Sequence, residues 1–246
     1  MGIKYAVNEN FFKKWSPEMT YILGYFYADG SMEDASYLRG KYIRVSSIDK
    51  STILKIRNWL KSKHTIVKIN PPTNNGHKRY LLRIGNHTLY NDLIKLGLYP
   101  NKSLTVKFPN IPQKYFNHFV RGYFDGDGCV RICMRKGKRQ KLVISKLSTV
   151  FTCGSKEFLE KLAKQLNENI KTKNIKVYNG CKSYMLCYST EDSVKLFKFL
   201  YRNLNKNDFL ERKFDRFRDY FNKRPQRIDS KVNNILRYLG NGQVVK

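Results

Sequence analysis

The sequence is poor in acidic residues. It has 19 Asp and Glu against 48 Lys and Arg in 246 residues, so the formal net charge is +29. The basic residues are spread through the chain rather than gathered in one tail. An excess of this size predicts a polyanionic partner, because a solvated surface alone accounts for only a few units of charge.

The sequence also lacks long hydrophobic runs. No stretch has the length of a membrane span, and the N-terminus has no signal-peptide pattern. No long amphipathic basic helix and no lipidation signal accompany the charge, so nucleic acid is favoured over a membrane as partner. We expect a soluble, intracellular protein in a bacterial or archaeal cytoplasm or an organelle.

Metal-binding patterns of cysteine and histidine are absent. The five cysteines are odd in number and include no CxxC pair, and the four histidines have no HExxH spacing. This excludes the usual zinc and metalloprotease arrangements. We interpret the cysteines as small buried strand residues in a reducing compartment: Cys129, Cys133, Cys153, Cys181 and Cys187.

A ten-residue sequence motif, called the phrase below, occurs twice. The copies are Tyr-Ile-Leu-Gly-Tyr-Phe-Tyr-Ala-Asp-Gly at 21–30 and Phe-Val-Arg-Gly-Tyr-Phe-Asp-Gly-Asp-Gly at 119–128, identical at five positions. Each reads as an apolar helix that ends at an acid and a glycine. Ser16 and Pro17 are typical of the start of the first helix. Gly30 and Gly128 are expected to adopt the left-handed conformation that ends many helices.

Small residues four apart share one face of each predicted helix. They are Gly24 and Ala28 in the first copy, and Gly122 and Gly126 in the second. Such faces allow two helix backbones to approach closely. If the two copies pack together, their matched acids emerge at the same end, where the helix dipole is negative and two carboxylates repel unless a cation joins them.

The acids of the phrase therefore predict a metal site. Asp29 and Asp127 with nearby main-chain carbonyls make an all-oxygen ligand set, which suits Mg²⁺ better than Zn²⁺. The alternative is a pair of core helices with an aspartate near each C-terminus. Asp125 lies about 200° around the helix from Asp127, so we assign it a structural role.

The paired phrase resembles the signature of LAGLIDADG homing endonucleases in their single-chain, two-motif form, and the resemblance covers roughly residues 16 to 222. It implies an α+β fold of two pseudo-symmetric αββαββα halves that form a β-sheet saddle for DNA. The signature helices then form the interface through Gly24 and Gly122. The acids that bind the catalytic metals are Asp29 and Asp127, and the carbonyls of Ala28 and Gly126 are further ligands.

Hydrophobic periodicity supports a repeated architecture. After the first phrase comes a loop, then a strand at 37–46, a helix at 49–62, a hairpin at 65–84 and a helix at 88–98. The second half repeats this order. We expect halves at residues 1–108 and 109–222, joined by a linker at 108–113, and a basic tail at 223–246 with one short helix.

Basic strands provide candidate DNA contacts. A two-stranded ribbon fits the major groove, and two halves would cover on the order of 20 base pairs. Strand alternation and the basic hairpin tip at 135–141 select the following residues: Tyr42, Arg44, Arg79, Arg83, Arg131, Arg135, Lys138 and Arg139. The alternative is a solvated sheet face.

The resemblance further implies one basic residue beside each metal site, in contact with water or phosphate. Lys102 and Lys213 occupy comparable places after the last strands of the two halves. The expected function is that of a monomeric, sequence-specific double-strand DNA endonuclease. It would use Mg²⁺, with Mn²⁺ substituting and Ca²⁺ binding without cleavage. The alternative is an intron RNA maturase or a non-cleaving DNA-binding regulator on the same fold.

Overall fold

The computed structural model describes residues 5–35, 40–71, 76–137, 140–173, 176–205 and 208–240. The chain forms two compact units, residues 1–126 and 127–246. The boundary expected between residues 108 and 109 remains an expectation. Each unit contains a four-stranded antiparallel sheet, so the predicted α+β class is confirmed.

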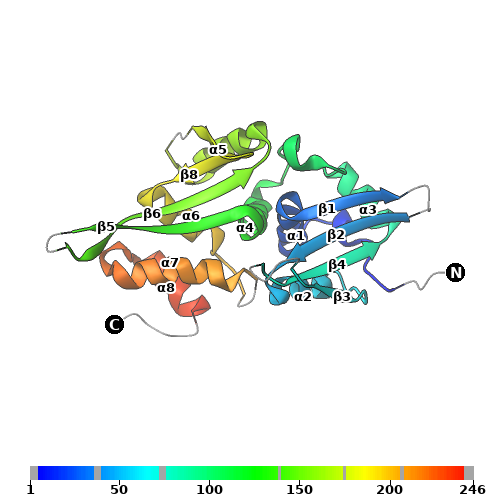
Figure 1. Ribbon diagram of the computed structural model, residues 1–246, viewed down its shortest axis with the longest axis horizontal. Coiled ribbons are helices and arrows are strands. Elements are labelled where there is room, and N and C mark those ends of the chain that lie inside the picture. The colour runs from blue at the N-terminus through cyan, green and yellow to red at the C-terminus, as the bar shows by residue number, and fades with distance from the viewer. Residues whose placement is uncertain are drawn as a thin grey trace. The chain divides into compact units, whose positions relative to one another are not determined.

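The first unit follows the predicted αββαββα order, with sheet order β1-β2-β4-β3 (Figure 1). Its elements are α1 (Pro17–Ala28), β1 (Gly30–Ala35), β2 (Gly40–Ser47), α2 (Lys50–Trp59), β3 (Ile66–Ile69), β4 (Arg79–Gly85) and α3 (His87–Lys95). Helix α4 (Phe116–Asp127), which carries the second signature, follows, and all but its last residue belong to this unit. Single 3₁₀ turns lie at Phe11–Lys13, Lys102–Leu104 and Gln113–Tyr115.

The second unit repeats the strand pairing, with sheet order β5-β6-β8-β7. Its elements are β5 (Gly128–Lys136), β6 (Leu142–Cys153), α5 (Lys156–Ile170), β7 (Val177–Asn179), β8 (Tyr184–Tyr188), α6 (Thr190–Leu200), α7 (Glu211–Lys223), a 3₁₀ turn (Pro225–Arg227) and α8 (Ser230–Leu239). Helix α8 is the short tail helix predicted from the sequence. No helix in the described part of the chain is long and apolar enough to cross a membrane.

Strand alternation decides which face of each sheet is buried. In the first unit Ile43 and Val45 of β2 and Leu82 and Ile84 of β4 are buried on the face covered by α2 and α3. The residues between them point to the opposite face, as period two requires. The segment after the first signature is not the expected loop: it is strand β1, which pairs with β2 although its sequence has few apolar residues.

The glycines that follow the two signatures do not have the expected left-handed conformation. Within the described residues, the glycine with positive φ is Gly97. Helix α1 ends at Ala28 with Asp29 as its right-handed C-cap, and Gly30 begins β1. A Cβ atom on Gly30 would lie 2.5 Å from the Phe26 ring. The glycine is needed for close packing rather than for a positive φ.

The cysteine prediction is also wrong for most positions. Cys153 is buried, but Cys129, Cys133 and Cys181 are exposed and Cys187 is half-buried, all as free thiols. Cys129 and Cys133 alternate with the buried side of β5 and therefore lie on the outer face of the sheet.

The first unit is centred on the contact between α1 and α4. A Cβ on Gly24 would lie 2.1 Å from the carbonyl oxygen of Phe119, and one on Gly122 would lie 2.0 Å from that of Tyr21. The two helix backbones therefore meet at the matched glycine of each signature. This is the close approach that the spacing of small residues predicted.

We expect Gly24→Ala and Gly122→Ala each to lower the free energy of unfolding by about 1–3 kcal/mol, because the new methyl group would overlap a main-chain carbonyl. In an exposed helix the same change would instead be stabilising by about 1 kcal/mol. Urea unfolding measures the difference.

Gly137→Ala is the control, since its Cβ would meet the Val143 methyl groups at 3.1 Å and the carbonyl oxygen of Lys141 at 3.4 Å, without the overlap found in the helix pair. Unchanged or increased stability in the two helix variants would contradict the close approach.

Candidate active site and nucleic-acid interface

Asp29 lies at the C-terminal end of α1, where its N–H donates to the carbonyl of Tyr25 at 2.9 Å. Its side chain is half-buried. Burial, followed by the charge of Asp29, raises the pKa of Tyr25, so that its hydroxyl stays protonated beside the carboxylate. Asp29 is thus an acid at the negative end of a helix, as the signature predicted.

The C-terminal end of α4 lies beside this carboxylate. A Cβ on Gly126 would lie 2.4 Å from the Cβ of Ala28 and 3.5 Å from Oδ2 of Asp29. The absence of a side chain at residue 126 therefore leaves room next to the Asp29 oxygen. Asp127, the second acid of the prediction, follows directly in the sequence and is half-buried like Asp29.

These residues fit a hard divalent cation. The available donors are the carboxylate oxygens of the two signature acids and the main-chain carbonyls next to them. A side chain at Gly126 would fill the space beside Asp29. Within the described residues, no three His, Cys, Asp or Glu side chains form a cluster that could hold a metal ion. The main-chain carbonyls of Ala28 and Gly126 would have to complete the coordination.

Asp125 has the structural role expected for it. It is 1% exposed, and its Oδ2 accepts a hydrogen bond of 2.7 Å from the hydroxyl of Tyr21 on α1. Burial, then the charge of Asp125, raises the pKa of Tyr21 well above its ordinary value, which keeps the donor protonated. On the other flank of the helix pair the rings of Tyr27 and Phe119 meet edge to face at 5.4 Å.

The two predicted lysines are both buried. Lys102 is 6% exposed, and its Nζ donates to the carbonyl oxygen of Tyr27 at 3.0 Å. That carbonyl belongs to the last turn of α1, two residues before Asp29. Lys213 is 5% exposed and lies in the first turn of α7. Burial of an ammonium group is costly unless it is paired, so Lys102 is held in a fixed position rather than free to sample the surface.

The four first-half DNA candidates share the outer face of their sheet. Arg44 and Arg83 are direct cross-strand partners, and the guanidinium of Arg83 lies 3.5 Å above the Tyr42 ring. Arg79 donates to Ser46 Oγ at 3.0 Å on the same face. The side assigned by alternation is confirmed by the structure, but contact with DNA remains a prediction.

Glu33 is a residue that sequence reasoning missed. It lies on β1 opposite Tyr42, and its carboxylate pairs with Arg83 at 3.1 Å and with Arg44 at 3.8 Å. All three side chains are about two-fifths exposed. The segment was expected to be a loop, so the alternation that places Glu33 beside the arginines was not recognised.

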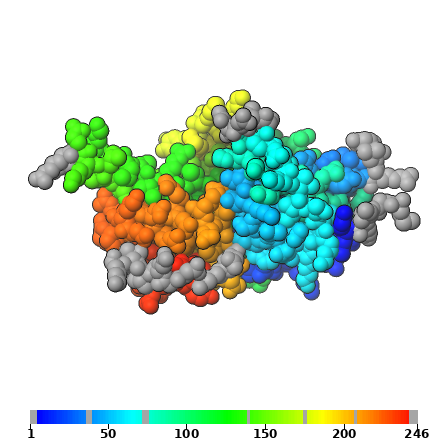
Figure 2. Space-filling view, turned by 60° about the horizontal axis from the view of Figure 1, so that its bottom comes forward, coloured from blue at the N-terminus to red at the C-terminus, as the bar shows by residue number. Residues whose placement is uncertain are grey.

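The second sheet has a basic outer face of its own. Arg131 and Arg135 on β5 are exposed and point away from the buried Val130. Lys138 and Arg139, the predicted residues of the hairpin tip, lie outside the described residues. Strands β5 and β6 extend past α7 and α8 of the same unit (Figure 2). Their ends form a two-stranded ribbon on which Met134 and Leu142 are also exposed.

One protein-family model matches part of the second half of the chain. Residues 120–223 match the LAGLIDADG endonuclease family. A curated relative, reverse gyrase of Methanocaldococcus jannaschii, is 27% identical over 150 residues, which are 60% of this chain but 8% of that protein. The chain therefore aligns with only a small part of that relative.

Solved structures share the whole fold. The homing endonuclease I-WcaI bound to its DNA recognition sequence has a TM-score of 0.55 at 14% identity, covering 85% of this chain and 90% of that one. I-SmaMI, bound to an uncleaved DNA target in the presence of calcium ions, has a TM-score of 0.54 at 12% identity, covering 93% and 99%. At these identities the likeness shows the fold.

We expect Lys102→Met to lower the free energy of unfolding by about 1–3 kcal/mol, because the stem is kept but a charge-assisted hydrogen bond to Tyr27 is lost. Lys107→Met, at an exposed position nearby, is the control and should be close to neutral. Equal effects in urea unfolding would show that the buried hydrogen bond does not stabilise the end of α1.

Proposed function

We propose that this chain, whose residues 120–223 match the LAGLIDADG endonuclease family and whose fold is shared with solved homing endonucleases, is a sequence-specific DNA endonuclease that hydrolyses phosphodiester bonds with a divalent metal. The observation that carries the proposal is the contact of the duplicated helices, which puts the carboxylate of Asp29 beside the end of α4. A nuclease that has lost its activity and kept only binding would be expected to have lost the signature acids, and both are present.

Asp29 and Asp127 would hold the metal ions, together with the carbonyls of Ala28 and Gly126. When bound, divalent cations would activate water and neutralise charge at the scissile phosphates. Each acid would serve one strand of the duplex, so that a double-strand break needs both. Mg²⁺ is the proposed physiological ion, with Mn²⁺ as a substitute and Ca²⁺ as an ion that binds without cleavage.

Lys102 is proposed to provide positive charge near the Asp29 end of α1. Its Nζ is held on the Tyr27 carbonyl, so the charge is preorganised and no side-chain entropy is lost when substrate arrives. Lys213 is proposed to do the same beside Asp127. Such fixed charge stabilises a phosphate more in its transition state, where negative charge develops on the leaving oxygen.

The outer faces of the two sheets are proposed to bind double-stranded DNA over roughly 20 base pairs, with the protein acting as a monomer. Arginine can bind guanine bidentately in the major groove, and a two-stranded ribbon such as β5–β6 fits that groove. The alternative function is that of an intron RNA maturase or a non-cleaving DNA-binding regulator, which would use the same basic surfaces without the acids.

We expect Asp29→Asn and Asp127→Asn each to reduce double-strand cleavage at least about a hundredfold, because several kcal/mol of metal-dependent stabilisation are lost. Duplex binding should persist. The assay uses Mg²⁺ and a supercoiled plasmid that carries a site selected from a randomised library, with Ca²⁺ as the non-cutting condition.

Asp34→Asn, the same change at an exposed acid of the first unit, is the control. Undiminished cutting by either signature variant would remove its assigned role, and duplex binding without any cutting by the unsubstituted protein would favour the regulator.

We expect Glu33→Gln to raise affinity for random-sequence duplex and to reduce discrimination in favour of the selected site. The substitution releases Arg44 and Arg83 to neutralise phosphates, so the slope of log K against log salt should steepen by up to about 0.9 for each arginine. Stability should change by less than about 1 kcal/mol, since the ion pairs are exposed.

Glu157→Gln removes an exposed acid from α5 and is the control. Weaker binding of random-sequence duplex by Glu33→Gln would mean that Glu33 supports contact with DNA rather than competing with it.

A further inference from the structure

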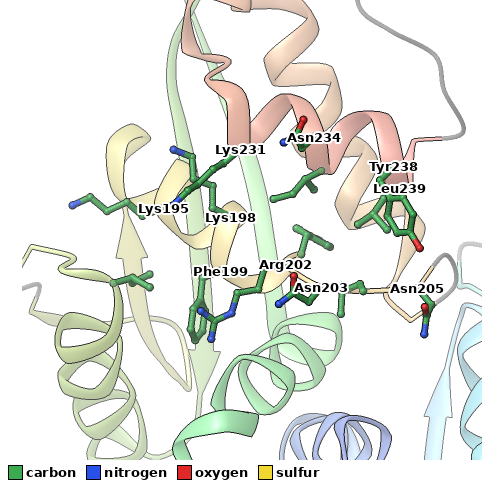
Figure 3. A pocket seen from close by; sticks show the side chains of 14 residues that line it. Lys195, Lys198, Phe199, Arg202, Asn203, Asn205, Lys231, Asn234, Tyr238 and Leu239 are labelled. Atoms are coloured by element: carbon green, nitrogen blue, oxygen red, sulfur yellow. The ribbon is translucent and has the colours of Figure 1, made fainter.

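The second unit contains a cleft of about 820 Å³ between α6, the segment that follows it, and α8. Figure 3 shows the side chains that line it. Helix α8 has no counterpart in the repeat of the first half, and its buried residues Val232, Leu236 and Leu239 attach it to the rest of the unit. The cleft is therefore a feature that the duplicated architecture does not require.

The lining is basic. Four cationic side chains line the cleft, and none of its described lining residues is acidic: the four are Lys195, Lys198, Arg202 and Lys231. Arg202 and Lys231 form no ion pair within the described part of the chain. Since neither is paired with an acid among the described residues, these residues give the cleft a positive potential even after the pairs made by the other two lysines.

Those two lysines are partly neutralised by acids that do not line the cleft. Lys195 Nζ pairs with Asp192 at 3.0 Å, and Lys198 pairs with Asp229, the N-cap of α8. Burial tends to raise the pKa of Asp229, but hydrogen bonds from Lys198 and from the main chain outweigh it and lower the pKa. Lys198 thus fastens α8 to α6 and has a structural role.

Flat side chains accompany the charge. The guanidinium of Arg202 lies 4.9 Å from the centre of the Phe199 ring, and Tyr238 is 58% exposed at the other side of the cleft. Asn203, Asn205 and Asn234 add amide donors and acceptors. Guanidinium planes and exposed rings are the surfaces on which unpaired bases stack.

The cations of the cleft come from separate elements. Lys195 and Lys198 lie on α6, Arg202 follows the end of that helix, and Lys231 lies on α8. Positive charges contributed by several elements suit a nucleic-acid strand, which carries a phosphate at every step.

We propose that this cleft binds a single-stranded segment of nucleic acid, with its phosphates along Arg202 and Lys231 and a base stacked on Tyr238. Helix α6 packs on the inner face of its sheet and α8 packs on α6, so the cleft lies on the helical side of the second unit. It is separate from the outer face proposed for duplex DNA, and the inference goes beyond the proposed nuclease function.

The test measures binding of labelled oligouridylate and oligothymidylate by fluorescence anisotropy over a range of salt concentrations. The double variant Arg202→Ala/Lys231→Ala is expected to lower affinity at least about tenfold and to reduce the salt slope by about 0.7 for each cation removed. Tyr238→Ala is expected to lose about 1–3 kcal/mol of binding, equivalent to a loss of roughly five- to more than a hundredfold, while Tyr238→Phe keeps the ring and the affinity.

Lys161→Ala, which removes an exposed charge from α5 of the same unit, is the control. The proposal is overturned if neither oligonucleotide binds saturably, or if the double variant binds as well as Lys161→Ala does. Tight binding of oligouridylate alone identifies RNA as the ligand. Equal binding of both means that the cleft recognises phosphates and stacked bases and does not distinguish RNA from DNA.

Cleavage of the selected duplex is measured in the same variants and should be unchanged, because none of these residues is placed in the catalytic or duplex-binding machinery. If the unsubstituted protein cuts no DNA but the cleft variants lose single-strand binding, the nuclease proposal fails and the cleft proposal stands.

Discussion

The contact between the main chains of α1 and α4 is the constraint on which the first unit depends. Gly24 and Gly122 are each placed so that even a methyl group would overlap a carbonyl oxygen of the other helix. Two backbones at this separation leave little freedom in rotation or register. The contact therefore fixes where Asp29 emerges relative to the last turn of α4, which is the precise placement of charge that the proposed metal site requires.

The flanks of the helix pair show that the two copies have diverged without losing this geometry. On one side Tyr21 donates to the buried Asp125, and on the other Tyr27 packs edge to face on Phe119. A polar contact and an aromatic contact thus fill equivalent places. The hydrogen bond from Tyr21 to Oδ2 offsets part of the cost of burying the Asp125 carboxylate.

The net charge and the individual ion pairs of this protein have different effects. The net charge of +29 draws polyanions to the surface without specifying where they bind. Local acids then organise the cations: Glu33 joins Arg44 to Arg83 on the first sheet, and Asp229 holds Lys198 so that α8 forms one wall of the basic cleft. These two acids have a large local influence, because each fixes the position of longer and more flexible basic side chains.

The sequence predicted the repeated signature, the order of elements and the outward face of the arginines, because these follow from local periodicity. It failed where a partner strand or helix decides the outcome. Residues 30–35 have little strand propensity of their own and become β1 by pairing with β2, and Gly30 is required by the Phe26 ring rather than by its own φ. Cys129 and Cys133 are exposed because of the side of β5 on which they fall.

The amino-acid sequence by itself determined the duplicated motif, the candidate acids and the basic character, since all of these are properties of residue type and spacing. Only the tertiary structure decided that Lys102 is buried on the Tyr27 carbonyl, that Glu33 lies between two arginines, and that α8 encloses a cleft with α6. The physical reason is that each of these features joins residues distant in the chain, and the pairing energy of such contacts leaves no periodic trace in the sequence.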